Sequence, residues 1–143
     1  MNLVLLFTFA CAATAWSFPQ YGTLFISKIG SADAHQFIGI IDSTLDDRGD
    51  TLMSVSQELG TIGPAFRFTY LGVMDGKFAL VGAEDDHFQL VPKIITQAGS
   101  VYGKILSYMN STDFTLCGDH SIGVQRECEG AVPITIELKG IFD

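Results

Sequence analysis

The stretch PKIITQAGSVYGKILSYM, residues 92–109, decides which fold class the sequence predicts. Plotted at 100° per residue, its apolar side chains fall within an arc of roughly 140°, and its polar side chains fall on the opposite side. Pro92 stands where the first residue of a helix is favoured, and Asn110 stands where a helix commonly ends. This pattern predicts one long amphipathic helix over residues 92–109.

The residue types in the same stretch favour strands instead. It is rich in Ile, Val, Thr and Tyr, which prefer strands. Gly99 and Gly103 would each cost about 1 kcal/mol in the interior of a helix. Two strands that turn at Gly99-Ser100 are therefore the alternative. Because propensity is a weaker signal than the separation of polar from apolar side chains, we favour the helix.

Turn residues divide the rest of the chain into short apolar segments that are typical of strands. Runs of β-branched and apolar residues predict strands over residues 23–29, 37–41 and 132–138. In the last of these, three apolar residues alternate with polar ones: Ile134, Ile136 and Leu138.

The clearest hairpin is expected to join residues 66–73 to residues 77–82. Asp75-Gly76 lies between the two runs, and this dipeptide supplies the positive φ angles that tight hairpin turns need. In the first run, aromatic residues alternate with polar ones: Phe66, Phe68 and Tyr70 with Arg67 and Thr69.

Residues 51–59 match the pattern of a two-turn helix. Asp50 can cap the start of this segment and Gly60 can end it. Three of its apolar residues share one helical face: Leu52, Val55 and Leu59. The predicted fold class is therefore α+β: a single small domain, mostly antiparallel sheet, with a long helix at 92–109 and a short helix at 51–59.

Composition and charge exclude several classes of protein. Of 143 residues, 48% are hydrophobic, which is too many for an intrinsically disordered chain. Sixteen acidic residues against eight basic ones give a net charge of −8, which would repel a nucleic-acid backbone. The length suits one compact domain.

The first seventeen residues have the pattern of a secretory signal peptide. An apolar run of about thirteen residues, Leu3 to Ala15, ends with the small residues Ala13 and Ala15. A run this short does not span a bilayer, which needs about 20 apolar residues, so no membrane span is expected. We predict a signal peptide at 1–17 and a single secreted globular domain at 18–143; a buried N-terminal strand is the alternative.

Two further features agree with a secreted, extracellular protein. Removing residues 1–17 leaves Cys117 and Cys128, which we expect to form a disulfide in an oxidising compartment. Asn110 begins the tripeptide Asn-Ser-Thr, an acceptor for N-glycosylation. We therefore predict an acidic, disulfide-bonded extracellular glycoprotein.

Two acidic clusters raise the question of a bound calcium ion. Neither matches an EF-hand loop, and acidic turns that keep the protein soluble explain both more simply. We expect no cofactor, with a weak calcium site as the alternative. Its ligands would come from these residues: Asp42, Asp46, Asp47, Asp50, Glu84, Asp85 and Asp86.

One part of the chain resembles thioredoxin-like domains. Residues 37–82 are predicted as strand, helix, strand and strand, and Pro133 in Ala131-Val132-Pro133-Ile134-Thr135 resembles the proline that opens a strand in that family. The redox cysteines of the family are missing here. The resemblance therefore implies a non-redox, peptide-binding domain.

The sequence contains no motif that names a reaction, so we favour a protein that is not an enzyme. The leading hypothesis is a secreted binding protein for a protein partner or an apolar ligand. A small extracellular hydrolase is a second hypothesis, with His120 acting together with Ser121 or an acidic residue. An acidic, calcium-associated protein of the extracellular matrix is the third.

Overall fold

Thirteen β-strands and no helix make up the regular structure of the described residues, so the predicted α+β fold class is wrong. The structure is a computed structural model that describes residues 19–95, 100–124 and 126–141. The strands are β1 (Gln20–Ile29), β2 (Ala32–Phe37), β3 (Gly39–Ile41), β4 (Thr44–Asp46), β5 (Leu52–Ser56), β6 (Thr61–Pro64), β7 (Tyr70–Met74), β8 (Lys77–Val81), β9 (Phe88–Ile95), β10 (Ser100–Tyr108), β11 (Phe114–Leu116), β12 (Ile122–Gly123) and β13 (Val132–Gly140).

The predicted signal peptide at 1–17 lies outside the described residues. Within those residues, the chain has no helix whose length and hydropathy would let it cross a membrane.

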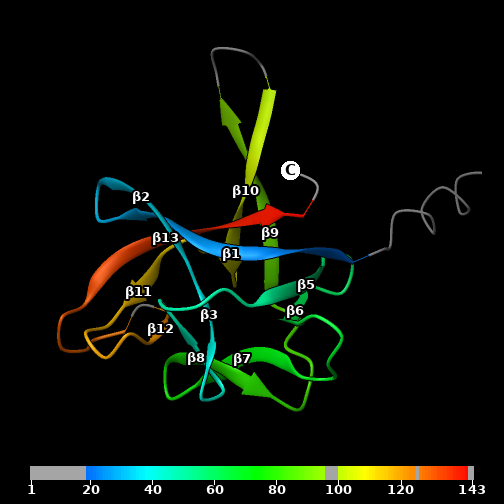
Figure 1. The fold of residues 1–143 in the computed structure, drawn as a ribbon, viewed down its shortest axis with the longest axis horizontal. Helices are drawn as coiled ribbons and strands as arrows, with labels where there is room; N and C mark the ends of the chain where they lie inside the picture. Colours follow the sequence, from blue (N-terminus) through cyan, green and yellow to red (C-terminus); the bar gives the residue numbers. More distant parts are fainter. Residues whose placement is uncertain (1–18, 96–99, 125, 142–143) are drawn as a thin grey trace, which may run out of the picture.

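The strands form one continuous antiparallel sheet that curls until it is nearly a closed barrel (Figure 1). The order of neighbouring strands is β3-β4-β8-β12-β11-β13-β1-β5-β6. The other four strands attach to this path: β2 pairs with β1, β7 pairs with β8, and β10 pairs with both β13 and β9. Because β6 lies against β7, the sheet bends back toward its own far side. Figure 1 also shows β9 and β10 extending beyond the other strands.

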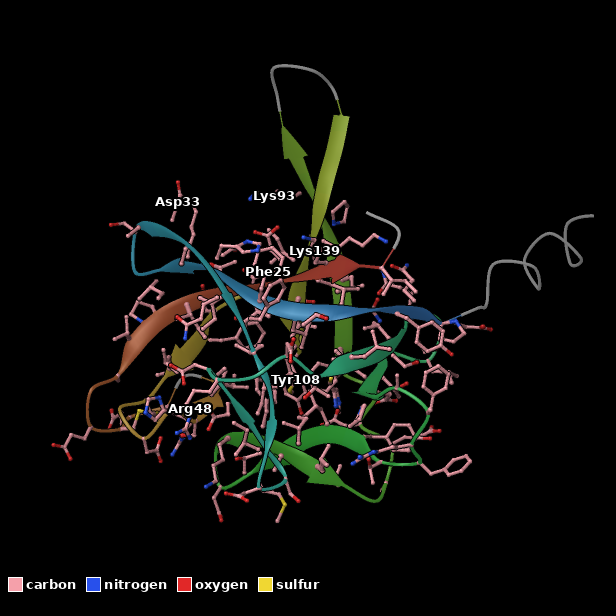
Figure 2. All side chains as sticks on the ribbon, viewed as in Figure 1. Phe25, Asp33, Arg48, Lys93, Tyr108 and Lys139 are labelled. Carbon is pink, nitrogen blue, oxygen red and sulfur yellow. A yellow bond between two sulfur atoms is a disulfide. The ribbon has the colours of Figure 1, made fainter. Side chains whose placement is uncertain are left out.

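Side chains fill the interior of this curved sheet. The predicted strands at 23–29 and 132–138 are confirmed as β1 and β13, which pair along most of their length. Their buried residues alternate with more exposed ones, as expected for strands with one buried face. At the centre, the ring of Phe78 lies 5.5 to 5.6 Å from three other rings, which together with it form the aromatic core: Phe88, Tyr108 and Phe114. Tyr108 lies near the middle of the molecule in Figure 2.

The predicted helix over residues 92–109 is wrong. These residues form the end of β9 and all of β10, while residues 96–99 lie outside the described part. The alternative is correct in its two strands, but Ser100, which was expected in the turn, is already paired with Ile95 in β10. Leu90 pairs with Leu106 and Phe88 pairs with Tyr108, and all four side chains are buried.

Two physical causes favour the strands here. The β-branched and aromatic residues fit a pleated sheet, and β10 also finds a partner in β13, which no local pattern can reveal. Pro92 lies opposite Lys104, next to a shift of register between Val101 and Lys104. A proline, which has no N–H to donate, is tolerated in a strand at such an irregularity.

The predicted short helix over residues 51–59 is also wrong. Met53 and Val55 are buried while Leu52 is exposed, so β5 follows the two-residue period of a strand. Only one helix-like turn follows, where the Gly60 N–H donates to the Ser56 carbonyl at 2.8 Å. Since residues 37–82 contain no helix, the resemblance to thioredoxin-like domains fails as well.

The predicted Asp75-Gly76 turn is confirmed, but the strand before it is shorter than expected. β7 and β8 pair up to Met74 and Lys77, and Asp75 and Gly76 have φ angles of 53° and 80°. The first strand begins at Tyr70 rather than at Phe66. The reason is local: Phe66 has a φ of 63°, which is incompatible with an extended strand.

A close contact positions the loop between β6 and β7, and two hydrogen bonds join the turn between β5 and β6 to β9. The chain at Thr69 crosses β6 at Gly63, where any Cβ would collide with the Thr69 carbonyl oxygen. Nearby, the side-chain amide of Gln57 donates to the Leu90 carbonyl at 3.1 Å and accepts from the Leu90 N–H at 2.9 Å. Gln57 thereby satisfies backbone groups of β9 that an adjacent strand would otherwise satisfy.

Candidate functional site

The most exposed aromatic side chains lie on residues 65–69, which we call the FRF loop after Phe66, Arg67 and Phe68. Phe66 is 85% exposed and Phe68 is 94% exposed. The ring of Phe66 stacks on Tyr21 of β1, with centroids 5.5 Å apart and planes 16° apart. The FRF loop thus presents two large apolar groups to solvent, and one of them is held in place by the sheet.

Arg67 lies between two hollows in the surface. The first, which we call the hydroxyl pocket, has a volume of about 250 Å³ and is lined by Ser54, Ser56, Thr61, Gly63, Pro64, Arg67, Phe68, Thr69 and Tyr70. The second, the Leu52 pocket, has a volume of about 290 Å³ and is lined by Ile40, Thr51, Leu52, Pro64, Ala65 and Arg67. Neither lining contains an acidic residue from the part of the chain that the structure describes, although the whole chain carries sixteen.

The sequence pattern does not predict this site, because it favours a strand at Phe66 and Phe68. Alternation of aromatic and polar residues is the normal signature of a half-buried strand, and here it occurs in a loop. The Gly63-Pro64 dipeptide just before the loop was the available signal, since such pairs commonly mark turns and loops.

In the first predicted calcium cluster, Asp46 and Asp47 each have a partner of their own. Arg48 donates to both carboxylate oxygens of Asp46, and these hydrogen bonds lower the pKa of Asp46. Asp47 accepts from the side chain of Gln36. Asp42 lies in the turn between β3 and β4, and Asp50 is exposed.

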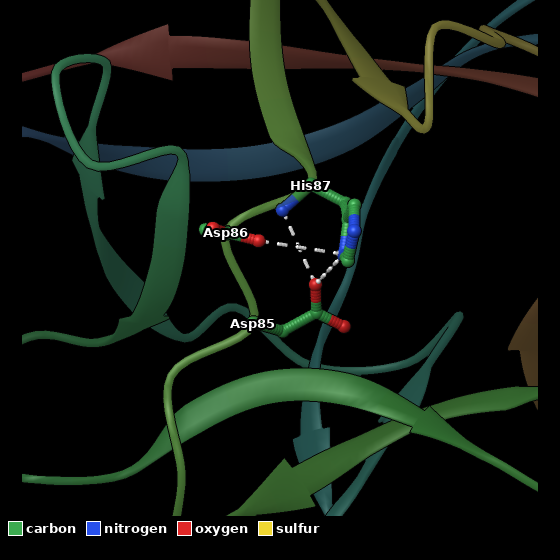
Figure 3. Close-up of side chains that lie close together, drawn as sticks. All are labelled: Asp85, Asp86 and His87. Atoms are coloured by element: carbon green, nitrogen blue, oxygen red, sulfur yellow. Dashed lines mark hydrogen bonds and ion pairs between the residues drawn. The ribbon is translucent and has the colours of Figure 1, made fainter.

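In the second cluster, Asp85 and Asp86 are brought together with His87 (Figure 3). Their ligand atoms lie within 4.8 Å of one another, and no other such trio occurs among the described residues; Glu84 is not part of it. His87 Nδ1 is 2.7 Å from Asp85 Oδ1, and the Tyr108 hydroxyl donates to Asp85 Oδ2 at 2.7 Å. A cation at Asp85 would therefore compete with His87 and Tyr108, so calcium binding stays a prediction.

The hydrogen bonds of Asp85 also change how its neighbours titrate. Burial and the hydrogen bond to Asp85 raise the pKa of Tyr108 to about 12. The hydrogen bond to Asp85, aided by the charge of Asp86, raises the pKa of His87 above its ordinary value of 6.5. Tyr108 therefore remains a neutral hydrogen-bond donor at physiological pH. His87, whose pKa is raised, loses its proton at a higher pH than an unperturbed histidine does.

We predict a dependence of stability on pH that comes from His87. A group whose pKa is higher in the folded state stabilises that state fully below its unfolded pKa of 6.5, and this contribution is lost as the pH rises through the raised value. His87→Gln should therefore remove part of the fall in unfolding free energy above pH 6.5. Urea unfolding over a series of pH values measures this.

His35→Gln is the matched control for that experiment. His35 contacts the rings of Phe25 and Phe37, and it has no carboxylate partner among the described residues. The His35→Gln variant should therefore keep the fall in unfolding free energy above pH 6.5. Identical pH profiles for His87→Gln and the unaltered protein would contradict the prediction.

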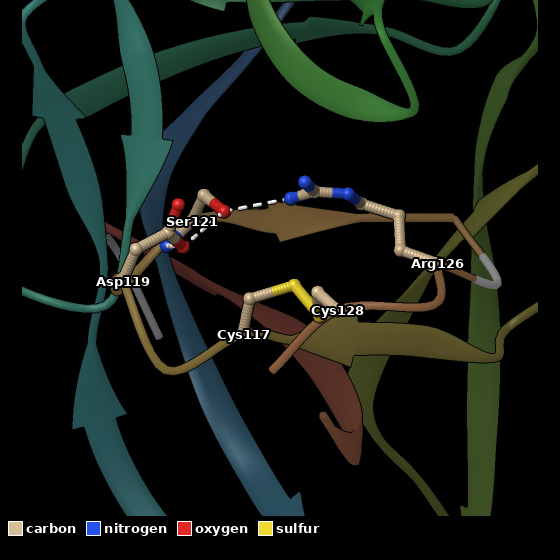
Figure 4. Close-up of a disulfide and its surroundings, with 5 residues drawn as sticks. All are labelled: Cys117, Asp119, Ser121, Arg126 and Cys128. Carbon is tan, nitrogen blue, oxygen red and sulfur yellow. Dashed lines mark hydrogen bonds between the residues drawn. A yellow bond between two sulfur atoms is a disulfide. The ribbon is translucent and has the colours of Figure 1, made fainter. Parts of the chain in front are cut away.

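Of the two pairings in the hydrolase hypothesis, His120 is found with an acidic residue and not with Ser121. His120 Nδ1 is 2.8 Å from Asp47 Oδ1, so the histidine pairs with an acidic residue. The Ser121 hydroxyl instead donates to Asp119 at 2.6 Å and accepts from Arg126 at 2.7 Å (Figure 4). The hydrogen bond from Ser121 lowers the pKa of Asp119. The Ser121 oxygen is thus oriented away from the role of a histidine-activated nucleophile.

Cys117 and Cys128 form a disulfide, as predicted, with Cα atoms 5.8 Å apart (Figure 4). A disulfide is compatible with an extracellular location. A hollow of about 590 Å³ lies beside it, and its lining includes the carboxylates of Asp119 and Glu129. This hollow therefore has the opposite electrostatic character from the hydroxyl pocket.

Asn110, the predicted glycosylation site, lies in an exposed turn. Met109 and Asn110 have φ angles of 50° and 64°, and Tyr108 and Ser111 are bridged on either side of them. This position is accessible from solvent, and glycosylation itself stays a prediction.

No protein-family model, no curated protein and no solved structure matches this chain. The indications of its function therefore come from the geometry of the protein's own residues.

Proposed function

We propose that the protein is a secreted, non-enzymatic binding protein that contacts a protein partner through the FRF loop. The single observation that carries this proposal is the exposure of Phe66 and Phe68, at 85% and 94%, on one five-residue loop. Aromatic residues and arginine are enriched where proteins bind one another. Exposed apolar groups gathered in one place favour an interaction site.

The filled interior supports a protein partner rather than an apolar ligand held inside the barrel. Phe78, Phe88 and Phe114 are buried and pack against one another, together with Tyr108. A carrier for an apolar molecule would need space among such side chains. The stack between Phe66 and Tyr21 also limits the motion of the loop, which lowers the entropy that binding costs.

Site-specific photo-cross-linking tests this proposal. A photoreactive phenylalanine analogue is placed at Phe66 or Phe68, and the protein is then secreted by cells of its source organism. We expect both positions to yield an adduct with the same protein, identified by mass spectrometry. The matched controls place the analogue at Met74 and Met109, which are 52% and 63% exposed.

Adducts that are the same at all four positions would contradict the proposal, and so would their absence at Phe66 and Phe68. The double variant Phe66→Ser/Phe68→Ser adds a second check. It should abolish co-purification of the cross-linked partner, while the unfolding free energy falls by no more than about 1.5 kcal/mol, because both side chains are exposed and the stack of Phe66 on Tyr21 is lost.

A further inference from the structure

We propose that the hydroxyl pocket binds the carboxylate of an acidic side chain on the protein partner, and that Phe66 and Phe68 contact apolar residues beside it. This inference rests on the proposed function and adds the chemistry that the partner must carry.

The side-chain hydrogen-bonding groups that line the hydroxyl pocket favour an anion. No acidic residue of the described part of the chain lines the pocket, whose lining includes Arg67 and five residues that carry a hydroxyl group: Ser54, Ser56, Thr61, Thr69 and Tyr70. A carboxylate accepts hydrogen bonds and donates none, so arginine and hydroxyl donors match it. The chain as a whole has a net charge of −8. Because no described acidic residue lines this pocket, an anion bound there has no carboxylate directly beside it to repel it.

Arg67 supplies the charge for this interaction. Within the described part of the chain, its guanidinium has no hydrogen-bond or ion-pair partner. Two other cations there are already paired, Arg48 with Asp46 and Lys93 with Glu137. A guanidinium presents paired N–H donors that match the two oxygens of a carboxylate.

The hydroxyl of Thr69 provides an independent indication of a missing partner. Thr69 Oγ1 is buried and forms no hydrogen bond in the described structure. Leaving such a group without a partner costs about 1–3 kcal/mol. Thr69 lines the pocket, so an acceptor seated there can satisfy its hydroxyl after a rotation about χ1. The hydroxyl of Ser56 already accepts from the Leu59 N–H at 3.2 Å, which leaves its own proton free to donate.

The surroundings favour an acidic peptide side chain over an acidic sugar. At about 250 Å³, the pocket is smaller than the roughly 300–1,000 Å³ that suits drug-sized ligands. Beyond Arg67 lies the Leu52 pocket, whose lining is partly polar and includes the apolar residues Ile40, Leu52 and Pro64. Together with the two exposed phenylalanine rings, this surface fits an acidic residue that has apolar neighbours in the partner's chain.

Peptide binding, followed by NMR on the full secreted protein labelled with ¹⁵N, tests the proposal. The probes are acetyl-Leu-Glu-Leu-amide, acetyl-Leu-Gln-Leu-amide and glucuronic acid. The Glu peptide should shift the amide signals of Ser54, Thr61 and Thr69 saturably. The Gln peptide should bind at least about tenfold more weakly, because it lacks the charge-assisted hydrogen bonds.

Two variants separate the contributions of Arg67 and Thr69. Arg67→Gln should remove the preference for the Glu peptide over the Gln peptide. Thr69→Val should weaken binding of the Glu peptide without lowering the urea midpoint, because a methyl group replaces a hydroxyl that has no partner in the free protein. A Thr69→Val variant that binds the Glu peptide as tightly as the unaltered protein would argue against the role of this hydroxyl.

Equal binding of the Glu and Gln peptides would overturn the proposal. If that equal binding is lost in Phe66→Ser/Phe68→Ser, the proposed function still stands. Failure of both peptides to bind, or tighter binding of glucuronic acid than of the Glu peptide, would also overturn the acidic-peptide proposal. If the protein prefers the Glu peptide but no partner is cross-linked, the carboxylate site is supported and the proposed function is contradicted.

Discussion

Replacing Phe78 by alanine should lower the free energy of unfolding by about 3–5 kcal/mol, which is more than we expect for any of the other variants. Phe78 is 0% exposed and its ring contacts Phe88, Tyr108 and Phe114, so alanine would leave a cavity at the centre of the aromatic core. The surrounding rings are held by different strands, which limits how far they can collapse into that space. Urea unfolding should show a midpoint lower by more than about 1 M.

Phe68→Ala is the matched control for this prediction. It removes the same atoms from a side chain that is 94% exposed, so the unfolding free energy should change by less than about 0.5 kcal/mol. Equal losses in the two variants would show that burial within the barrel does not explain the stability of the protein. A small loss for Phe78→Ala alone would show that the core repacks around the cavity.

Removal of the disulfide is expected to have the second-largest effect. In Cys117→Ser/Cys128→Ser, the free energy of unfolding should fall by about 2–3 kcal/mol, because the cross-link no longer restricts the unfolded chain. The closed loop contains β12, and it is also held by a hydrogen bond from the Gly118 N–H to the Glu129 carbonyl at 2.8 Å. Thermal and urea unfolding of the variant and of the oxidised protein measure the difference.

The loop's own hydrogen bonds provide the control for the disulfide experiment. Arg126→Ala removes the hydrogen bond to Ser121 and keeps the disulfide, so it should cost clearly less than the double serine variant. If the two variants lose equal stability, the polar contacts rather than the cross-link hold this region. A double variant as stable as the oxidised protein would also contradict the prediction.

The hairpin around Asp75-Gly76 shows what local sequence can predict. Its turn depends on two neighbouring residues that tolerate positive φ, and the structure has φ angles of 53° and 80° there. The disulfide likewise needs only the two remaining cysteines and an oxidising compartment. The β13 strand follows from the alternation of apolar and polar residues, and the three apolar ones, Ile134, Ile136 and Leu138, are all buried.

Residues 92–109 show where local pattern is insufficient. A stretch that is rich in apolar residues can match the 3.6-residue period of a helix and also the two-residue period of a strand. The pattern alone then does not distinguish the two structures. Here β9 begins at Phe88, and the buried pairs Phe88–Tyr108 and Leu90–Leu106 decide the register. Those pairs, together with the contact of β10 with β13, are tertiary interactions.

The candidate site was still less accessible to sequence reasoning. Phe66 and Phe68 alternate with polar residues as strand residues do, and only the crossing of the chain over Gly63 places them in an exposed loop. The hydroxyl pocket combines residues from β5, β6 and the FRF loop. Acidic clusters were visible in the sequence, but the structure gives Asp46 and Asp85 partners of their own.

By itself the sequence determined the turn at Asp75-Gly76, the paired cysteines and the alternating strands β1 and β13, because each depends on residues close together in the chain or on a single pairing rule. The tertiary structure alone decided that residues 92–109 are strands and that Arg67 lies unpaired between two pockets. Strand pairing and burial join residues far apart in the chain, and the free energy of those contacts exceeds the weak local preferences of any one segment.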